Sequence, residues 1–176
     1  MRKIQFGCGG LPIEGWENHD RDVDISKPIP MDSGSVDVVF CEMTVEHVST
    51  REAWNFLEEC HRILKSGGLI RIVIPDFVKC WKARDSYWLK INQEVTHNDG
   101  TLKEQFKTML FYHGHQSLWT SELMKSVLEV IGFQKVSIKN PMESDHDELR
   151  NVEQHQKAAG LEATLAESGC VEGVRI

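Results

Sequence analysis

Residues 69–76 read Leu-Ile-Arg-Ile-Val-Ile-Pro-Asp, and this stretch decides the fold class. Five of its first six residues are apolar. A short apolar run of this kind is typical of a strand buried on both faces, as the strands of a parallel sheet are. Pro75 ends the run, because proline has no N–H for the hydrogen bonds of a sheet. We therefore expect a buried strand at 69–74.

The residues before this strand predict a second strand and a helix. Val36-Asp37-Val38-Val39-Phe40 is another apolar run, and Ser49 with Glu52 has the spacing of a capping box at a helix N-terminus. The apolar residues that follow fall on one helical face: Ala53, Leu57, Cys60 and Leu64. Gly67-Gly68 is expected to end this helix, which gives a right-handed strand, helix, strand crossover.

Both ends of the chain continue the alternation of strands and helices. Residues 3–6 predict a short strand that breaks at Gly7-Cys8-Gly9-Gly10, where the backbone could approach a ligand closely. Thr120 is expected to cap a helix that ends at Gly132, with strands at 136–138 and 170–176 after it. The helix has these apolar residues at helical spacing: Leu123, Val127, Val130 and Ile131. The order indicates an α/β domain.

Length, composition and charge limit the classes of protein to which this chain could belong. A chain of 176 residues with 40% hydrophobic residues can bury one core, so we expect a single domain over 1–176. The sequence has neither a long uncharged apolar run nor a visible export signal, which predicts a cytoplasmic protein without a membrane span. A formal net charge of -7 disfavours nucleic acid as a partner and leaves a small molecule. The oligomeric state is left open.

Several motifs occur in an order that resembles a known family. In sequence order they are Gly7-Cys8-Gly9, 15–20 (GWENHD), 28–31 (PIPM), 35–37 (SVD), Glu46-His47, 57–68 (LEECHRILKSGG), 69–76 (LIRIVIPD) and 132–136 (GFQKV). Together they resemble the class I S-adenosylmethionine-dependent methyltransferases, in particular a compact branch with a GCG turn and a GWxNxD segment, similar to the type 11 methyltransferases. The resemblance implies a Rossmann-like, mostly parallel sheet with one antiparallel strand near the edge.

The same resemblance implies a site for S-adenosylmethionine beyond the carboxyl ends of the strands. By position, Gly7 and Gly9 line the methionine part of the cofactor, and Asp20 accepts hydrogen bonds from the ribose hydroxyls. Asp24 and Ile25 border the adenine, and two residues lie near the sulfonium, Cys41 and Glu42. The full set implied for cofactor binding is Phe6, Gly7, Cys8, Gly9, Asp20, Asp24, Ile25, Cys41, Glu42 and Glu46.

Two features depart from the common pattern of this family. Gln5 stands where many members carry an acidic residue just before the glycine turn. About 11 residues separate Gly9 from Asp20, against roughly 20 in dinucleotide-binding folds, so the first helix is expected to be vestigial.

Methyl transfer from a sulfonium is a one-step displacement, so the enzyme mainly aligns the acceptor with the methyl group. For a hydroxyl acceptor, four residues could take the proton: His47, Asp76, His113 and His115. Glu46-His47 could instead be a hydrogen-bonded pair that fixes a loop. We predict no metal site, because His113 and His115 have no clear third ligand and the polar run 144–148 (SDHDE) is typical of an exposed loop.

The acceptor itself is the least determined feature. Residues 77–119 and 140–168 are expected to be lid or acceptor-side insertions, and the preferred acceptor is a small hydroxylated molecule, such as a sugar, a lipid-linked compound or a secondary metabolite. Two alternatives have other functions. One is a non-catalytic module that binds S-adenosylmethionine or S-adenosylhomocysteine. The other is a nucleotide-sugar or NAD-binding oxidoreductase, which the missing GxGxxG pattern disfavours.

Overall fold

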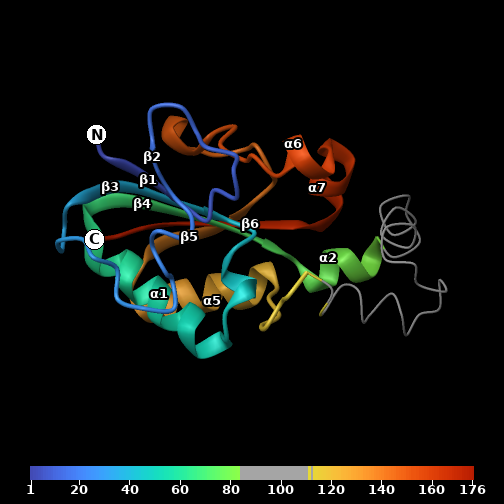
Figure 1. Ribbon diagram of the computed structural model, residues 1–176, viewed down its shortest axis with the longest axis horizontal. Coiled ribbons are helices and arrows are strands. Elements are labelled where there is room, and N and C mark those ends of the chain that lie inside the picture. Colours follow the sequence, from blue (N-terminus) through green and yellow to red (C-terminus); the bar gives the residue numbers. More distant parts are fainter. Residues whose placement is uncertain (84–110, 112) are drawn as a thin grey trace.

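The computed structural model describes residues 1–83, 111 and 113–176, which form a sheet with helices packed against it (Figure 1). The sheet has six strands in the order β2-β1-β3-β4-β6-β5. The strands are β1 (Lys3–Phe6), β2 (Glu17–His19), β3 (Val36–Glu42), β4 (Leu64–Pro75), β5 (Gln134–Lys139) and β6 (Ser168–Val174). The helices are α1 (Thr50–Ile63), α2 (Phe77–Lys82), α5 (Ser121–Ile131), α6 (Gln156–Ala159) and α7 (Leu161–Glu167), with 3-10 turns η1 (Val45–His47) and η3 (Asp147–Leu149).

β6 is the strand that runs against its neighbours. β1 pairs in parallel with β2 and β3, and β3 pairs in parallel with β4. β6 pairs antiparallel with both β4 and β5. The expected mostly parallel sheet with one antiparallel strand near the edge is confirmed.

The predicted crossover from β3 through α1 to β4 is also confirmed, with one correction at the end of the helix. Ser49 caps α1 through the complete capping box with Glu52. The helix ends at Ile63, before the glycines, and Leu64 already pairs with Val36 of β3. Gly67-Gly68 therefore lies in an irregular part of β4, where the register shifts, and does not end the helix.

Helix α5 begins after Thr120 and ends at Gly132, as predicted, but it buries a different set of side chains. The Thr120 hydroxyl accepts a hydrogen bond from the Leu123 N–H, and Gly132 has a φ of 118°. Leu123 and Val130 of the predicted apolar face are 45% and 72% exposed. Val127 of the predicted face is buried and Ile131 packs against the core, but Met124 and Leu128 are buried in place of the other two, a set that also follows helical spacing.

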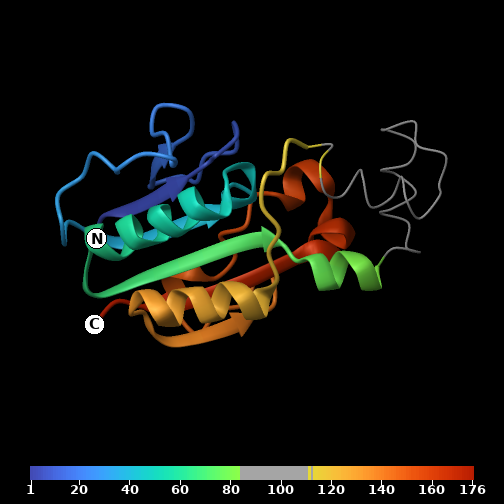
Figure 2. The ribbon, with the colours of Figure 1, turned by 90° about the horizontal axis from the view of Figure 1, so that it is seen from below.

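The two faces of the sheet are covered differently. Helices α1 and α5 lie side by side on one face, which is seen from below in Figure 2. Irregular chain covers the opposite face. The Trp16 ring packs edge-on against Phe40, and Val152 packs in the same cluster as Phe40 and Val73. The connection from β1 to β2 contains turns and no helix, which confirms the vestigial first helix.

We call residues 140–155 the covering segment, and a buried arginine of β4 anchors it to the sheet. The Arg71 side chain is fully buried and forms ion pairs with Glu153 of the covering segment and Glu172 of β6. It also donates hydrogen bonds to the backbone oxygens of Glu143, at 2.9 Å, and Asn140, at 3.2 Å. One side chain thus holds both ends of the covering segment against the sheet.

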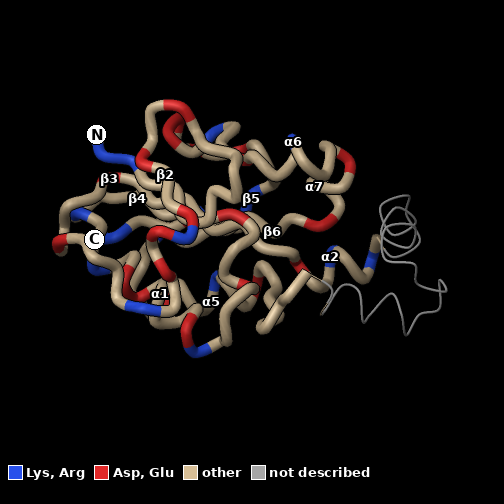
Figure 3. The backbone as a smooth tube through the Cα atoms, viewed as in Figure 1, with Lys and Arg blue, Asp and Glu red and all other residues tan. Residues whose placement is uncertain are grey.

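Charge is mixed over the part of the chain that the structure describes. Figure 3 shows Lys and Arg interspersed with Asp and Glu along this part of the backbone. None of the helices within the described ranges is both long and apolar enough to span a lipid bilayer. Most of the expected insertion at 77–119 lies outside the described residues.

Candidate functional site

The ends of three parallel strands bring the expected cofactor residues to one edge of the sheet. In the strand register, Phe6 of β1 lies opposite His19 of β2 on one side and Cys41 of β3 on the other. Gly7 and Asp20, which follow β1 and β2, and Glu42, the last residue of β3, therefore lie at the carboxyl edge. Open α/β sheets bind their ligands at this edge.

The glycine turn after β1 lies directly against the chain that leaves β3. Gly7 has a φ of +70°, and a Cβ atom placed on it would lie 1.9 Å from Oγ1 of Thr44. The Thr44 hydroxyl is held by its own hydrogen bond to the backbone oxygen of Glu42, at 2.7 Å. A side chain at position 7 does not fit, and the turn is pressed against the start of η1.

Asp20 and Asp24 lie in the loop after β2. Asp20 is exposed at the end of the strand, whereas Asp22 accepts hydrogen bonds from the Asp20 N–H and the His19 ring, both at 2.7 Å. Asp24 accepts hydrogen bonds from the side chain and backbone N–H of Ser26, which lower its pKa to about 2. Ile25 is buried. Asp20, Asp22 and Asp24 are all exposed, and Asp20 is the one that directly follows β2.

Gln5 has a structural role on the face away from α1. Its side chain is buried, its Oε1 accepts the N–H of Ile13 at 3.2 Å, and its Nε2 donates to the Leu11 oxygen at 3.4 Å. Gln5 therefore ties down the loop that follows the glycine turn. This accounts for an amide at a position where the resembling family often has an acid.

Glu42 ends β3 as a buried carboxylate that is only partly satisfied. Its Oε2 accepts hydrogen bonds from the backbone N–H groups of Gln154, at 2.7 Å, and His155, at 3.1 Å. Its Oε1 has no hydrogen-bond partner among the described residues. Burial raises the pKa of Glu42 to about 7, against the effect of these two donors. The neighbouring Cys41 thiol packs in the core, where burial raises its pKa well above the ordinary range.

His155 and Glu167 form an ion pair near Glu42. Nε2 of His155 lies 2.8 Å from Oε1 of Glu167. Burial lowers the pKa of His155, but the hydrogen bond and charge of Glu167 and the charge of Glu42 outweigh it, so the pKa lies above its ordinary value. The carboxyl edge thus gathers buried acidic groups beside one histidine.

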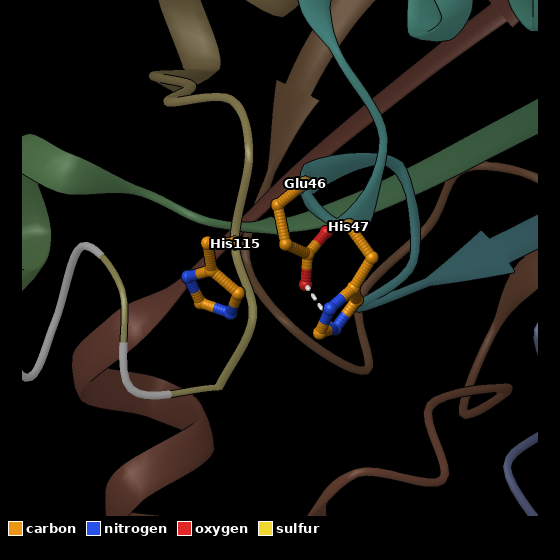
Figure 4. Close-up of side chains that lie close together, drawn as sticks. All are labelled: Glu46, His47 and His115. Atoms are coloured by element: carbon orange, nitrogen blue, oxygen red, sulfur yellow. Dashed lines mark ion pairs between the residues drawn. The ribbon is translucent and has the colours of Figure 1, made fainter.

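Glu46, His47 and His115 converge just beyond the glycine turn (Figure 4). One potential ligand atom from each residue lies within 4.8 Å of the other two. Nε2 of His47 is 3.9 Å from Oε1 of Glu46, and the His47 and His115 rings are 5.0 Å apart, nearly perpendicular. Neither carboxylate oxygen of Glu46 has a hydrogen-bond partner within the described ranges. Burial, then the charges of Glu167 and Glu42, raise the pKa of Glu46 to about 8.

Backbone contacts place His115 next to η1. The N–H of Gln116 donates to the Glu46 oxygen at 2.7 Å, and the Gln116 side chain donates to the His47 oxygen at 2.6 Å. The Ser117 N–H also donates to the Glu46 oxygen, at 3.2 Å. These bonds dock the chain before α5 against the 3-10 turn. Burial also lowers the pKa of His47.

Two other residues that could take a proton are placed differently. Asp76 caps α2, where Oδ1 accepts from the Val78 and Lys79 N–H groups, and Oδ2 accepts from the N–H and hydroxyl of Ser121. Burial would raise the pKa of Asp76, but these donors hold it below its ordinary value. His113 is exposed, and its ring lies 5.8 Å from that of His115.

Comparison with known proteins agrees with this geometry. Residues 14–72 match the family described as the methyltransferase domain. The fold is similar to that of solved methyltransferase structures. The sequence identities to these structures are low, so the similarity concerns the fold only. Residues 14–72 are therefore similar to a methyltransferase domain, and the described chain has the fold of the S-adenosylmethionine-dependent methyltransferases. Its methyl donor is accordingly S-adenosylmethionine.

Three solved structures illustrate the shared fold. An S-adenosylmethionine-dependent methyltransferase from Thermotoga maritima, described as a possible histamine N-methyltransferase, has a TM-score of 0.57 and 15% identity, over 99% of this chain and 82% of its own. A methyltransferase from Archaeoglobus fulgidus has a TM-score of 0.54 and 17% identity, over 98% and 85%. Phosphoethanolamine N-methyltransferase 2 of Haemonchus contortus, solved with S-adenosylmethionine, has a TM-score of 0.58 and 13% identity, over 99% and 48%. No curated protein sequence matches the chain significantly.

The sequence did not reveal the groups that the covering segment and α7 bring to the candidate site. Glu153, His155 and Glu167 lie in a stretch without hydrophobic periodicity. Their spacing matches no motif, so only the folded chain shows that they approach Glu42. The sequence also showed no clear third ligand for His113 and His115. In the structure, Glu46 and His47 lie beside His115.

Proposed function

We propose that this methyltransferase transfers a methyl group directly to a small-molecule acceptor held beside Glu46, His47 and His115. The main support is a set of buried carboxylate oxygens, on Glu42 and Glu46, that have no hydrogen-bond partners within the described residues. They lie on either side of Thr44, which contacts the glycine turn. A buried carboxylate needs a compensating positive charge. S-adenosylmethionine carries a cationic sulfonium and an ammonium group, and both fit this edge.

The cofactor-binding residues keep the roles that their positions imply. Phe6, Gly7, Cys8 and Gly9 would offer backbone atoms to the methionine part, because a close approach needs a turn without side chains. Asp20 would bind the ribose hydroxyls, with Asp24 and Ile25 beside the adenine. The remaining residues of the set would border the sulfonium: Cys41, through its backbone, Glu42 and Glu46.

We propose that the methyl acceptor is a hydroxyl group of a sugar, a lipid-linked compound or a secondary metabolite. His47 and His115 present two imidazole rings at the same place, and an imidazole can orient a hydroxyl group or accept its proton. His113, which is exposed, is a further residue that could accept this proton. Asp76 would support the site by capping α2, because both of its oxygens are already occupied.

Titration calorimetry tests the cofactor site. We expect binding of S-adenosylmethionine and S-adenosylhomocysteine in the micromolar range, and Asp20→Ala should weaken it at least about tenfold, which corresponds to the loss of about 1.4 kcal/mol. Asp32→Ala is the matched control, because Asp32 is exposed and precedes β3 at the opposite edge. Equal dissociation constants for both variants would show that Asp20 does not hold the ribose.

Methyl transfer is tested with S-adenosylmethionine labelled in its methyl group, against panels of hydroxylated and amine acceptors. Labelled product from a hydroxylated acceptor supports the proposal. Tight cofactor binding without turnover on any acceptor would favour the alternative, a non-catalytic cofactor-binding module. The five free cysteines fit a reducing compartment, so we also propose that the enzyme acts in the cytoplasm.

A further inference from the structure

The cluster of Glu46, His47 and His115 has a composition that methyl transfer alone does not require. It combines one carboxylate and two imidazoles from segments far apart in the sequence (Figure 4). Glu46 is 2% exposed, and both of its carboxylate oxygens lack hydrogen-bond partners among the described residues. Buried polar groups are nearly always satisfied, so an unsatisfied carboxylate between two imidazoles calls for a ligand.

We propose that Glu46, His47 and His115 bind one divalent transition-metal ion. Two histidines and one carboxylate are a common ligand set for zinc and non-haem iron. The three ligand atoms lie within 4.8 Å of one another. Atoms that each lie about 2.0–2.2 Å from one ion are at most about 4.4 Å apart, so small side-chain rotations suffice to close the site.

The surrounding backbone holds the ligands in place before an ion binds. Glu46 and His47 lie on the rigid 3-10 turn η1 at the end of β3. His115 is fixed beside them by the bonds from Gln116 and Ser117 to the Glu46 backbone oxygen, at 2.7 and 3.2 Å. A site assembled from ordered elements loses less conformational entropy when it binds its ion.

The ligand chemistry also predicts which ion binds. Imidazole nitrogens suit Zn²⁺, Co²⁺ and Fe²⁺, whereas Mg²⁺ prefers a shell of oxygen ligands. Three protein ligands leave at least one coordination position for water or for an oxygen of the methyl acceptor. With the ion bound, the imidazoles would hold the ion and would not accept a proton, and the ion would lower the pKa of the bound hydroxyl. The second possibility rests on the proposed function, whereas metal binding itself can be measured without any methyl acceptor.

Equilibrium dialysis of the chelator-treated full-length protein, with metal analysis, tests the proposal. We expect one Zn²⁺ or Co²⁺ per chain and no comparable binding of Mg²⁺. Glu46→Gln and His115→Ala should each weaken Zn²⁺ binding at least about tenfold. The matched control is His146→Ala, which removes a partly exposed histidine distant in sequence from the cluster and should bind like the wild type. Circular dichroism checks that each variant is folded.

The visible spectrum of bound Co²⁺ separates this site from thiol sites. Nitrogen and oxygen ligands give d–d bands without the near-ultraviolet charge-transfer band of a cysteine thiolate. A thiolate band, equal affinity in His115→Ala and the wild type, or the absence of stoichiometric Zn²⁺ binding would each overturn the proposal. Calorimetry measures cofactor binding separately, so a failure of the metal site is distinguished from a failure of the cofactor site.

Discussion

The Arg71→Met substitution tests whether the buried ion network holds the covering segment to the sheet. Arg71 pairs with Glu153 and Glu172, whose side chains are 0% and 4% exposed. Methionine fills part of the space but leaves two buried carboxylates without their cation. Removal of one partner from a buried pair costs about 3–5 kcal/mol. The backbone oxygens of Asn140 and Glu143 also lose a donor, so we expect a loss near the upper end of this range.

Urea denaturation followed by circular dichroism measures this loss as a change in the free energy of unfolding. For a chain of this size, each kcal/mol lowers the melting temperature by about 2–4 °C, so a decrease of at least about 6 °C is expected. The triple variant Arg71→Met, Glu153→Gln, Glu172→Gln removes the unpaired charges and should recover part of the stability. A loss below about 1 kcal/mol in the single variant would refute the reasoning.

Three further predictions follow from local geometry. Gly7→Ala should abolish cofactor binding and destabilise the fold, because its Cβ would overlap Thr44. Gly10→Ala, with a φ of +81° and no atom within 4 Å, should cost only the backbone strain of about 1–2 kcal/mol, and equal effects in calorimetry would contradict this assignment. Ser49→Ala should lower the free energy of unfolding by about 1 kcal/mol in urea, and an unchanged midpoint would rule out the capping box as a stabilising feature. His155 has a raised pKa when folded, so its contribution to stability is complete below its unfolded pKa of about 6.5 and is lost as the pH rises through the folded value. His155→Gln should therefore flatten the fall of the melting temperature above pH 6.5, and a parallel pH profile in the variant would contradict this.

Local patterns in the sequence predicted most of the fold. The strands at 36–40 and 69–74 and the helix capped by Ser49 were found because hydrophobic runs and capping residues act over a few neighbouring positions. The wrong predictions also come from patterns that involve only neighbouring residues. Gly67-Gly68 is a plausible helix end by itself, but the pairing of Leu64 with Val36 starts β4 earlier. The boundary between α1 and β4 was decided by the pairing of β4 with β3, which joins residues that are distant in the sequence.

The candidate site also combines features that the sequence predicted with features that only the tertiary structure shows. The order of motifs, from the GCG turn to GWENHD and the strand before Pro75, predicted the methyltransferase fold from the sequence alone, because these motifs contain or follow successive strands of the sheet. Only the tertiary structure decided that His115 lies against Glu46 and His47, and that Glu42 contacts the covering segment. Such contacts depend on how distant segments dock on the finished sheet, and neither helical nor strand periodicity contains that information.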